Sequence, residues 1–122
     1  MKHDSDNLIV VKAKSFALRI INAYKHLCDC HSEYVMSKQL LRCGTSIGAN
    51  VKEAVRGQSK NDFAAKMNIA LKEASETEYW VELLSEANYF NEDEAESLLA
   101  DCRQILRILM SIVKTSYSAA GK

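Results

Sequence analysis

The chain has 122 residues, with 16 lysines and arginines against 16 aspartates and glutamates, and it contains no proline. This length suits one domain, and the 48% hydrophobic fraction is enough for a core, whereas a formal net charge of zero argues against a protein uniformly coated in positive charge for nucleic acid. Because the first residues are polar, we expect no signal peptide. The sequence has no run of about 18 uncharged apolar residues, so we expect no membrane-spanning segment.

Four segments carry apolar residues at three- and four-residue steps, which is typical of amphipathic helices. The predicted helices cover about residues 7–28, 33–56, 60–88 and 92–117. Gly57 favours the end of the second helix, and Asn91 with Glu94 matches a capping box at the start of the fourth. No segment alternates with period two for long enough to predict a strand. The sequence therefore predicts an all-α, up-down-up-down antiparallel four-helix bundle that forms a single domain over residues 1–122.

A basic stripe follows one face of the second predicted helix, opposite its apolar side, and a weaker stripe follows the fourth. The residues are Lys38, Arg42, Lys52 and Arg56 on the second helix, and Arg103, Arg107 and Lys114 on the fourth. Cations separated by helical turns can follow a phosphate backbone, so these seven residues are the candidate nucleic-acid-binding residues. The alternative is an ordinary solvated helix face.

The zero net charge is a cancellation between the two halves of the chain. Residues 1–57 hold nine lysines and arginines and five aspartates and glutamates, a balance of +4. Residues 58–122 hold seven and eleven, a balance of −4. This asymmetry either stabilises the packing of two hairpins within one molecule or brings the basic side of one copy against the acidic side of another.

The third predicted helix has a second apolar side in addition to its core side. Its residues are Ala65, Ile69, Trp80, Leu83 and Ala87. Exposed apolar patches are rare in monomers, and tryptophan is enriched in interface cores, so this side is the candidate oligomer interface. The alternative is that a loop or a chain terminus covers it.

Two glycines lie one turn apart inside the second predicted helix, at positions 44 and 48. Each costs about 1 kcal/mol of helix stability relative to alanine. Close approach of another helix would compensate for this cost, so the pair predicts a tight helix–helix contact.

The sequence contains none of the patterns that would indicate a catalytic, metal or cofactor site. The Glu-x-x-His pairs of di-iron bundles, a Walker loop and a dinucleotide fingerprint are all absent. Cys28, Cys30 and His31 are too few and too closely spaced for a structural zinc site. We therefore expect a non-enzymatic cytoplasmic protein with reduced thiols, without metal, cofactor or small-molecule substrate.

Two stretches of the chain resemble a known family. Residues 37–54, SKQLLRCGTSIGANVKEA, resemble the signature second helix of the four-helix-bundle proteins encoded in intervening sequences of bacterial 23S ribosomal RNA genes. Asp62-Phe63 and residues 70–80, ALKEASETEYW, are similar to the other characteristic stretch of that family. The likeness extends over about residues 16–115.

The resemblance implies a cytoplasmic homopentamer without catalysis, for which nucleic acid, including ribosomal RNA, is the usual proposed ligand. A related bundle serves diversity-generating retroelements as an accessory protein that binds reverse transcriptase and RNA through a strongly basic pentamer, and this chain departs from it in having zero net charge. The sequence thus predicts a homo-oligomeric bundle that binds structured RNA through its basic helix face. The alternative is a protein-binding scaffold or accessory subunit without nucleic-acid contact.

Overall fold

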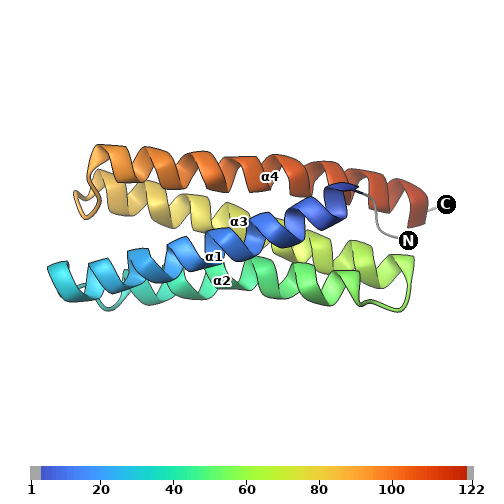
Figure 1. Cartoon of the computed structure of the whole chain (residues 1–122), viewed down its shortest axis with the longest axis horizontal. Coiled ribbons are helices and arrows are strands. Elements are labelled where there is room, and N and C mark those ends of the chain that lie inside the picture. Colours follow the sequence, from blue (N-terminus) through green and yellow to red (C-terminus); the bar gives the residue numbers. More distant parts are fainter. Residues whose placement is uncertain (1–3, 121–122) are drawn as a thin grey trace.

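Four antiparallel helices joined by short connections make up the computed structural model, which describes the backbone of residues 4–120 and the side chains of residues 7–118 (Figure 1). The helices are α1 (Asp4–His31), α2 (Met36–Val55), α3 (Lys60–Glu86) and α4 (Glu92–Ala120). No strand occurs within residues 4–120. The predicted all-α, up-down-up-down bundle is confirmed.

Several predicted helix ends are wrong by a few residues. α1 begins at Asp4 and continues to His31, where Ser32 leaves the helix with a φ of 50°. α2 begins only at Met36, where the preceding Glu33 carboxylate accepts hydrogen bonds from the first amides of the helix, and α4 continues to Ala120. α3 ends at Glu86, since Asn88 adopts the left-handed conformation, with a φ of 70°. These ends depend on turn geometry and capping, which hydrophobic periodicity does not report.

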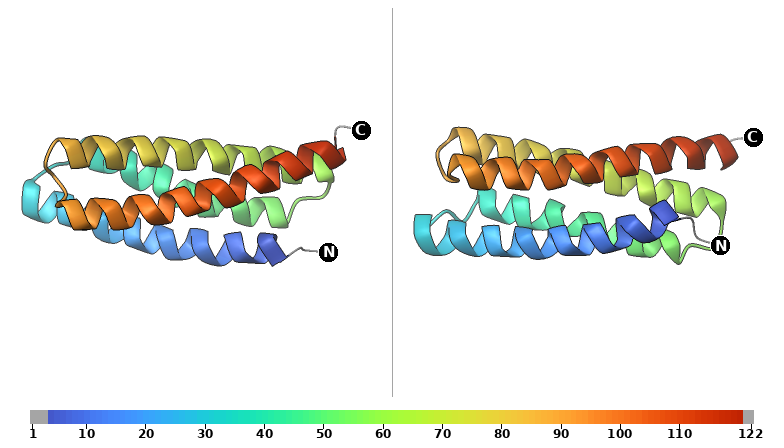
Figure 2. Two further views of the ribbon diagram at one scale, coloured as in Figure 1. Left: turned by 90° about the horizontal axis from the view of Figure 1, so that it is seen from above. Right: turned by 45° about the horizontal axis from the view of Figure 1, so that its top comes forward.

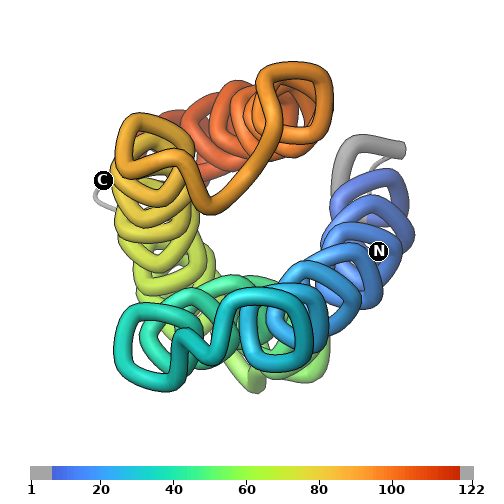
Figure 3. Tube along the Cα trace, turned by 90° about the vertical axis from the view of Figure 1, so that its left-hand side faces the viewer, coloured from blue at the N-terminus to red at the C-terminus, as the bar shows by residue number. Residues whose placement is uncertain are grey.

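Each helix packs against two neighbours, in the cyclic order α1, α2, α3, α4 (Figure 2). The contact between α1 and α4 is the smallest of the four. Within residues 4–120, the backbones of α1 and α3 stay apart, as do those of α2 and α4, so these pairs lie diagonally across the bundle, as the end-on view shows (Figure 3). None of the helices in this range is long and apolar enough to cross a membrane.

The predicted apolar stripes meet in one continuous core. Fully buried side chains from all four helices include Phe16, Ile20, Leu40, Ile47, Met67, Leu84, Ile105 and Leu109. Thr77 is also buried, and its hydroxyl donates a 2.7 Å hydrogen bond to the carbonyl oxygen of Glu73. The turn between α3 and α4 adds Phe90, which the helical periodicity did not predict to be in the core.

The tight helix contact predicted from the two glycines is confirmed between α1 and α2. A Cβ atom added to Gly44 would lie 2.8 Å from both Cγ atoms of Ile20 on α1. One added to Gly48 would lie 3.6 Å from the backbone of Ala13. Both glycines therefore face α1, but only Gly44 is at a distance that excludes a side chain.

A carboxylate just before α2 caps that helix. Glu33 accepts hydrogen bonds from the backbone amides of Val35, Met36 and Ser37 at 3.3, 3.1 and 2.7 Å, and the Ser37 hydroxyl donates to the carbonyl oxygen of Glu33 at 2.7 Å. Burial raises the pKa of the Glu33 carboxyl, but the amide hydrogen bonds outweigh it, so the pKa lies below its usual value. The negative charge also suits the positive end of the α2 dipole.

Replacing this carboxylate is expected to weaken the bundle in a pH-dependent way. Glu33→Gln should lower the free energy of unfolding at pH 7 by about 1 kcal/mol, the usual size of a cap. Because the folded pKa is lowered, the charge stabilises the protein above the unfolded pKa, and that stabilisation is lost as the pH falls through the folded pKa. Urea melts over a series of pH values from 7 downwards should therefore show a gap between the two proteins that narrows as the folded carboxyl becomes protonated. A gap of constant size throughout the series would contradict the role of the charge.

Candidate nucleic-acid interface

A groove of about 600 Å³ runs between the N-terminal half of α1 and the C-terminal half of α2. Thr45, Gly48 and Ala49 of α2 line the groove. These small residues let α1 and α2 approach closely and do not fill the groove. The apolar side chains of Val10, Val11, Ala17 and Val55 also line it. The groove is thus largely apolar between its charged residues.

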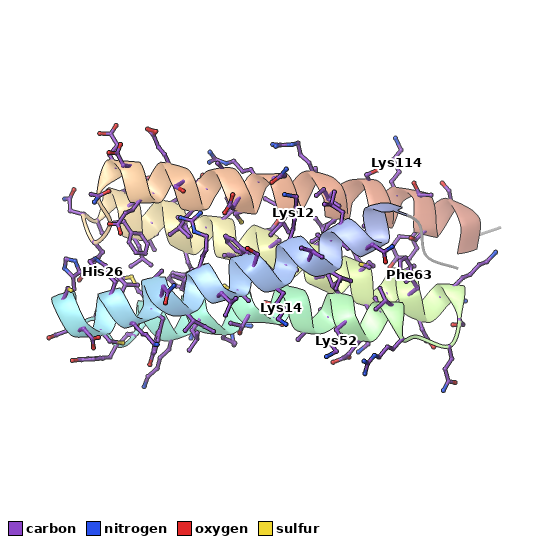
Figure 4. The ribbon with its side chains drawn as sticks, in the orientation of Figure 1. Lys12, Lys14, His26, Lys52, Phe63 and Lys114 are labelled. Atoms are coloured by element: carbon purple, nitrogen blue, oxygen red, sulfur yellow. The ribbon has the colours of Figure 1, made fainter. Side chains whose placement is uncertain are left out.

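Three cations line the groove, and none of the described side chains that line it is a carboxylate. Lys52 and Arg56 lie one turn apart on α2, where the helical period places them on one side, and Lys14 comes from α1. All three are exposed and form no ion pair with the described side chains. Lys14 and Lys52 are labelled on their two neighbouring helices in Figure 4. Three cations that pair with no described carboxylate therefore give this end of the α1–α2 face a positive potential.

A second hollow of about 740 Å³ lies on the other side of Lys52 and Arg56, towards the start of α3. Its lining includes Asp62 and the ion pair between Lys66 Nζ and a Glu53 carboxylate oxygen, at 2.8 Å. This hollow is mixed in charge, whereas the α1–α2 groove is not. Lys52 and Arg56 thus line both hollows, and only the second one also contains carboxylates among its described side chains.

Arg42 belongs to the predicted stripe, but its charge is balanced by α3. Its guanidinium donates hydrogen bonds to Glu76 at 2.6 Å and to Glu73 at 3.2 Å. These bonds, the one to Glu76 first, raise the pKa of the arginine. Arg42 therefore ties α2 to α3, and a phosphate would have to compete with two carboxylates for it.

The predicted α4 residues lie apart from the groove. Arg103 donates hydrogen bonds to Glu78 at 2.8 Å and to Glu82 at 3.0 Å, and so ties α4 to α3. Arg107 and Lys114 are exposed on α4, which lies diagonally opposite α2 in the bundle. Lys38 is exposed near the start of α2, roughly 21 Å along the helix from Lys52. The seven predicted residues therefore fall into separate places, and only Lys52 and Arg56 share the groove.

Lys14 is the groove residue that the sequence reasoning missed. It lies on a helix whose residues 7–28 contain four lysines and arginines and no aspartate or glutamate. That imbalance was a usable signal, because a helix whose middle part carries only cations, next to a basic stripe, concentrates positive charge at their junction. The stripe was found by helical angles within α2 alone, which do not report what a neighbouring helix contributes.

The candidate oligomer interface lies along α3. Ala65, Ile69 and Ala87 are exposed there, and Leu83 is half-buried. Trp80 packs partly against the core, and its indole N–H donates a 3.0 Å hydrogen bond to Glu76. The five residues thus form a partly exposed apolar side.

The cysteines and histidines do not assemble a reactive or metal-binding centre in the described residues. No group of three or more histidine, cysteine, aspartate or glutamate side chains with metal-binding geometry occurs among them. Burial raises the pKa of the Cys43 thiol and raises that of Cys102 to about 12, so both stay protonated as small core residues.

Comparisons with known proteins agree on the family. The model of the 23S rRNA-intervening sequence protein family matches residues 5–111. A crystal structure of a protein with unknown function from the S23 ribosomal protein family of Bacteroides thetaiotaomicron is 52% identical, with a TM-score of 0.88 over 90% of this chain and 98% of that one. Among curated proteins, none matches. The chain therefore belongs to the 23S rRNA-intervening sequence protein family, as the two sequence stretches predicted.

Proposed function

We propose that this protein is a non-enzymatic, homo-oligomeric bundle of the cytoplasm that binds structured RNA through the groove between α1 and α2. The observation that carries the proposal is the set of three exposed cations around a groove in which no described side chain is a carboxylate. Lys14, Lys52 and Arg56 are the principal contacts, and Lys38, Arg107 and Lys114 contribute through the wider field.

Charge and copy number together support RNA as the ligand. Unpaired lysines and arginines gain from phosphate contact through the release of counterions, whereas Arg42 and Arg103 would first have to leave their carboxylates. One groove offers few contacts, but several copies on one RNA would add their binding through a high effective concentration. The family resemblance implies five copies. Ribosomal RNA is the RNA to test first, because the family carries it in its name.

Reversing the groove charges is expected to abolish most of the RNA affinity. The triple variant Lys14→Glu, Lys52→Glu, Arg56→Glu should bind a labelled 23S rRNA hairpin at least about tenfold more weakly at low salt than the unmodified protein. Its plot of log affinity against log salt should be shallower by about 2–3, one lost phosphate contact per residue. Fluorescence anisotropy at several salt concentrations measures both quantities.

A second triple variant serves as the matched control. Lys38→Glu, Arg107→Glu, Lys114→Glu makes the same change in net charge at exposed positions outside the groove. It should lose clearly less affinity than the groove variant. Equal losses would show a general charge effect and overturn the groove, and absence of RNA binding by the unmodified protein at low salt would overturn the function.

A protein ligand is the second candidate, because much of the groove lining is apolar. An acidic amphipathic helix would place apolar residues against Val10, Val11 and Val55 and carboxylates against the three cations. Capture from lysate separates the two candidates: a protein partner survives nuclease treatment, and an RNA ligand does not.

A further inference from the structure

The groove between α1 and α2 has a cation on each wall and aliphatic side chains between them, which narrows the kind of RNA that fits it. Lys14 comes from α1, whereas Lys52 and Arg56 come from α2 (Figure 4). Among the aliphatic side chains, Val11 is 66% exposed. None of the described residues that line the groove is aromatic. A ligand that fills the groove therefore has to offer an apolar surface between negative charges.

The two lysines lie near the point where the two helices approach each other closely. A Cβ atom added to Gly48 would lie 3.6 Å from the backbone of Ala13, so these two residues are level with each other along the bundle. Lys14 follows Ala13, and Lys52 lies one turn beyond Gly48. Because the helices are antiparallel, the two lysines start roughly 6–8 Å apart along the bundle. Flexible side chains at this spacing can hold the phosphates on both sides of a single nucleotide.

The volume of the groove suits a nucleobase that has left its base pair. An apolar cavity of about 150 Å³ holds a benzene ring, and the groove, at about 600 Å³, has room for a base together with its sugar. The flat face of an unpaired base would lie against Val10, Val11 and Val55. A continuous duplex would instead bring sugars and phosphates against these valines, and such polar groups would lose water without gaining hydrogen bonds. The groove therefore fits an unpaired nucleotide better than a duplex.

Arg56 supplies a flat cationic surface at the end of the groove. It directly follows the last residue of α2, is exposed and forms no ion pair with the described side chains. Proteins that recognise unpaired RNA stack the splayed bases on aromatic rings or on guanidinium planes. Since no described aromatic side chain lines the groove, the Arg56 guanidinium is the planar group available there. A lysine at this position would carry the same charge but could not stack.

We propose that the groove selects RNA that contains an unpaired nucleotide turned out of its helix, such as a single-nucleotide bulge. This inference rests on the RNA binding in the proposed function and names the feature of the RNA that is recognised. Lys14 and Lys52 bind the phosphates on either side of the nucleotide, the base lies against the valines, and Arg56 stacks on the face of the base. Phosphate contacts give affinity without selection, so RNA binding and selection for an unpaired base are separate properties that can fail separately.

Three labelled RNA hairpins with the same stem test the selection. One is fully paired, one carries a single bulged adenosine, and the third carries the same bulge without its base. Fluorescence anisotropy is expected to show about tenfold tighter binding of the bulged adenosine than of the paired hairpin, as stacking of one base gives in other proteins. The bulge without a base keeps the flexibility of the backbone and should bind like the paired hairpin.

Two variants alter the groove without altering its charge. Arg56→Lys removes the guanidinium plane, and Ala49→Leu places a larger side chain at an exposed position of the groove lining. Both should bind the paired hairpin as the unmodified protein does, but should prefer the bulged adenosine by only about twofold or less. Ala100→Leu makes the same alanine-to-leucine change at an exposed position of α4 and should keep the full preference. Circular dichroism verifies that all three variants fold.

The outcomes separate the inference from the proposed function. If the unmodified protein binds the bulged and the paired hairpins equally well, the selection is wrong and RNA binding stands. If it binds none of the three hairpins at low salt, the proposed function itself is wrong. Equal binding of the bulges with and without a base would overturn the recognition of the base. A full preference in both groove variants, or its loss in Ala100→Leu, would overturn the groove as the place of selection.

Discussion

Replacing Phe16 with alanine is expected to lower the free energy of unfolding by about 3–5 kcal/mol, the range for a buried aromatic residue. Phe16 is one of the largest fully buried side chains, and it lies on α1 beside the contact with α4. Phe16 and Ile105 lie at the base of a surface hollow of about 150 Å³ between these two helices, which are the least extensively packed neighbours in the bundle. Truncation of Phe16 would enlarge the space between α1 and α4, and the few side chains at this contact could not fill it by small movements.

Thermal and urea unfolding of Phe16→Ala measure this effect. For a chain of this length, about 4 °C of melting temperature corresponds to 1 kcal/mol, so we expect a decrease of roughly 12–20 °C. Val35→Ala is the control, since Val35 is exposed in the connection between α1 and α2 and should change stability by no more than about 0.5 kcal/mol. A decrease below about 1 kcal/mol for Phe16→Ala would show that α1 does not pack on the core as described.

The two glycines of α2 are expected to respond to alanine with opposite signs. At Gly44 the new Cβ would lie 2.8 Å from Cγ1 and Cγ2 of Ile20, which is fully buried, so the side chain or the helix would have to shift. Overpacking of this kind costs about 1–3 kcal/mol, which exceeds the gain in helix propensity. At Gly48 the nearest atoms are 3.6 Å away, so the gain in helix propensity, up to about 1 kcal/mol, should remain.

Parallel urea melts of Gly44→Ala and Gly48→Ala check this pair of signs, and each variant is the control for the other. Both replace glycine by alanine in the same helix, so unfolded-state effects are closely matched. If both substitutions stabilise the protein, Gly44 lies further from Ile20 than described, because a Cβ only 2.8 Å from the Ile20 Cγ atoms would destabilise it. Destabilisation by both would mean that Gly48 is also held at contact distance.

The fold was accessible from sequence because each helix carries its own periodic apolar stripe. Ile20, Ile47 and Leu109 lie in the core where a 3.6-residue period places them. The tight approach at Gly44 was also predictable, since an unexplained helix-breaking residue inside a helix calls for a packing reason.

The site was less accessible, because its properties belong to pairs of helices. In the sequence, Arg42 and Arg103 look equivalent to Lys52 and Arg56. The structure distinguishes them, because carboxylates of α3 bind Arg42 and Arg103, whereas Lys52 and Arg56 line the groove. Lys14 joins the groove only once α1 lies beside α2. A helical wheel reports which residues share one face, but it does not report what lies opposite that face.

The cyclic order of the helices also bears on how the chain acquires its structure. Three of the four helix contacts join helices that follow each other directly along the chain, and the fourth, between α1 and α4, is the smallest. Most of the packing between helices therefore forms across short connections. The contact between α1 and α4, which joins the two ends of the chain, contributes the least packing. Such local connectivity is characteristic of rapidly folding proteins. A chain emerging from the ribosome can pair α1 with α2, and then α2 with α3, before α4 completes the bundle.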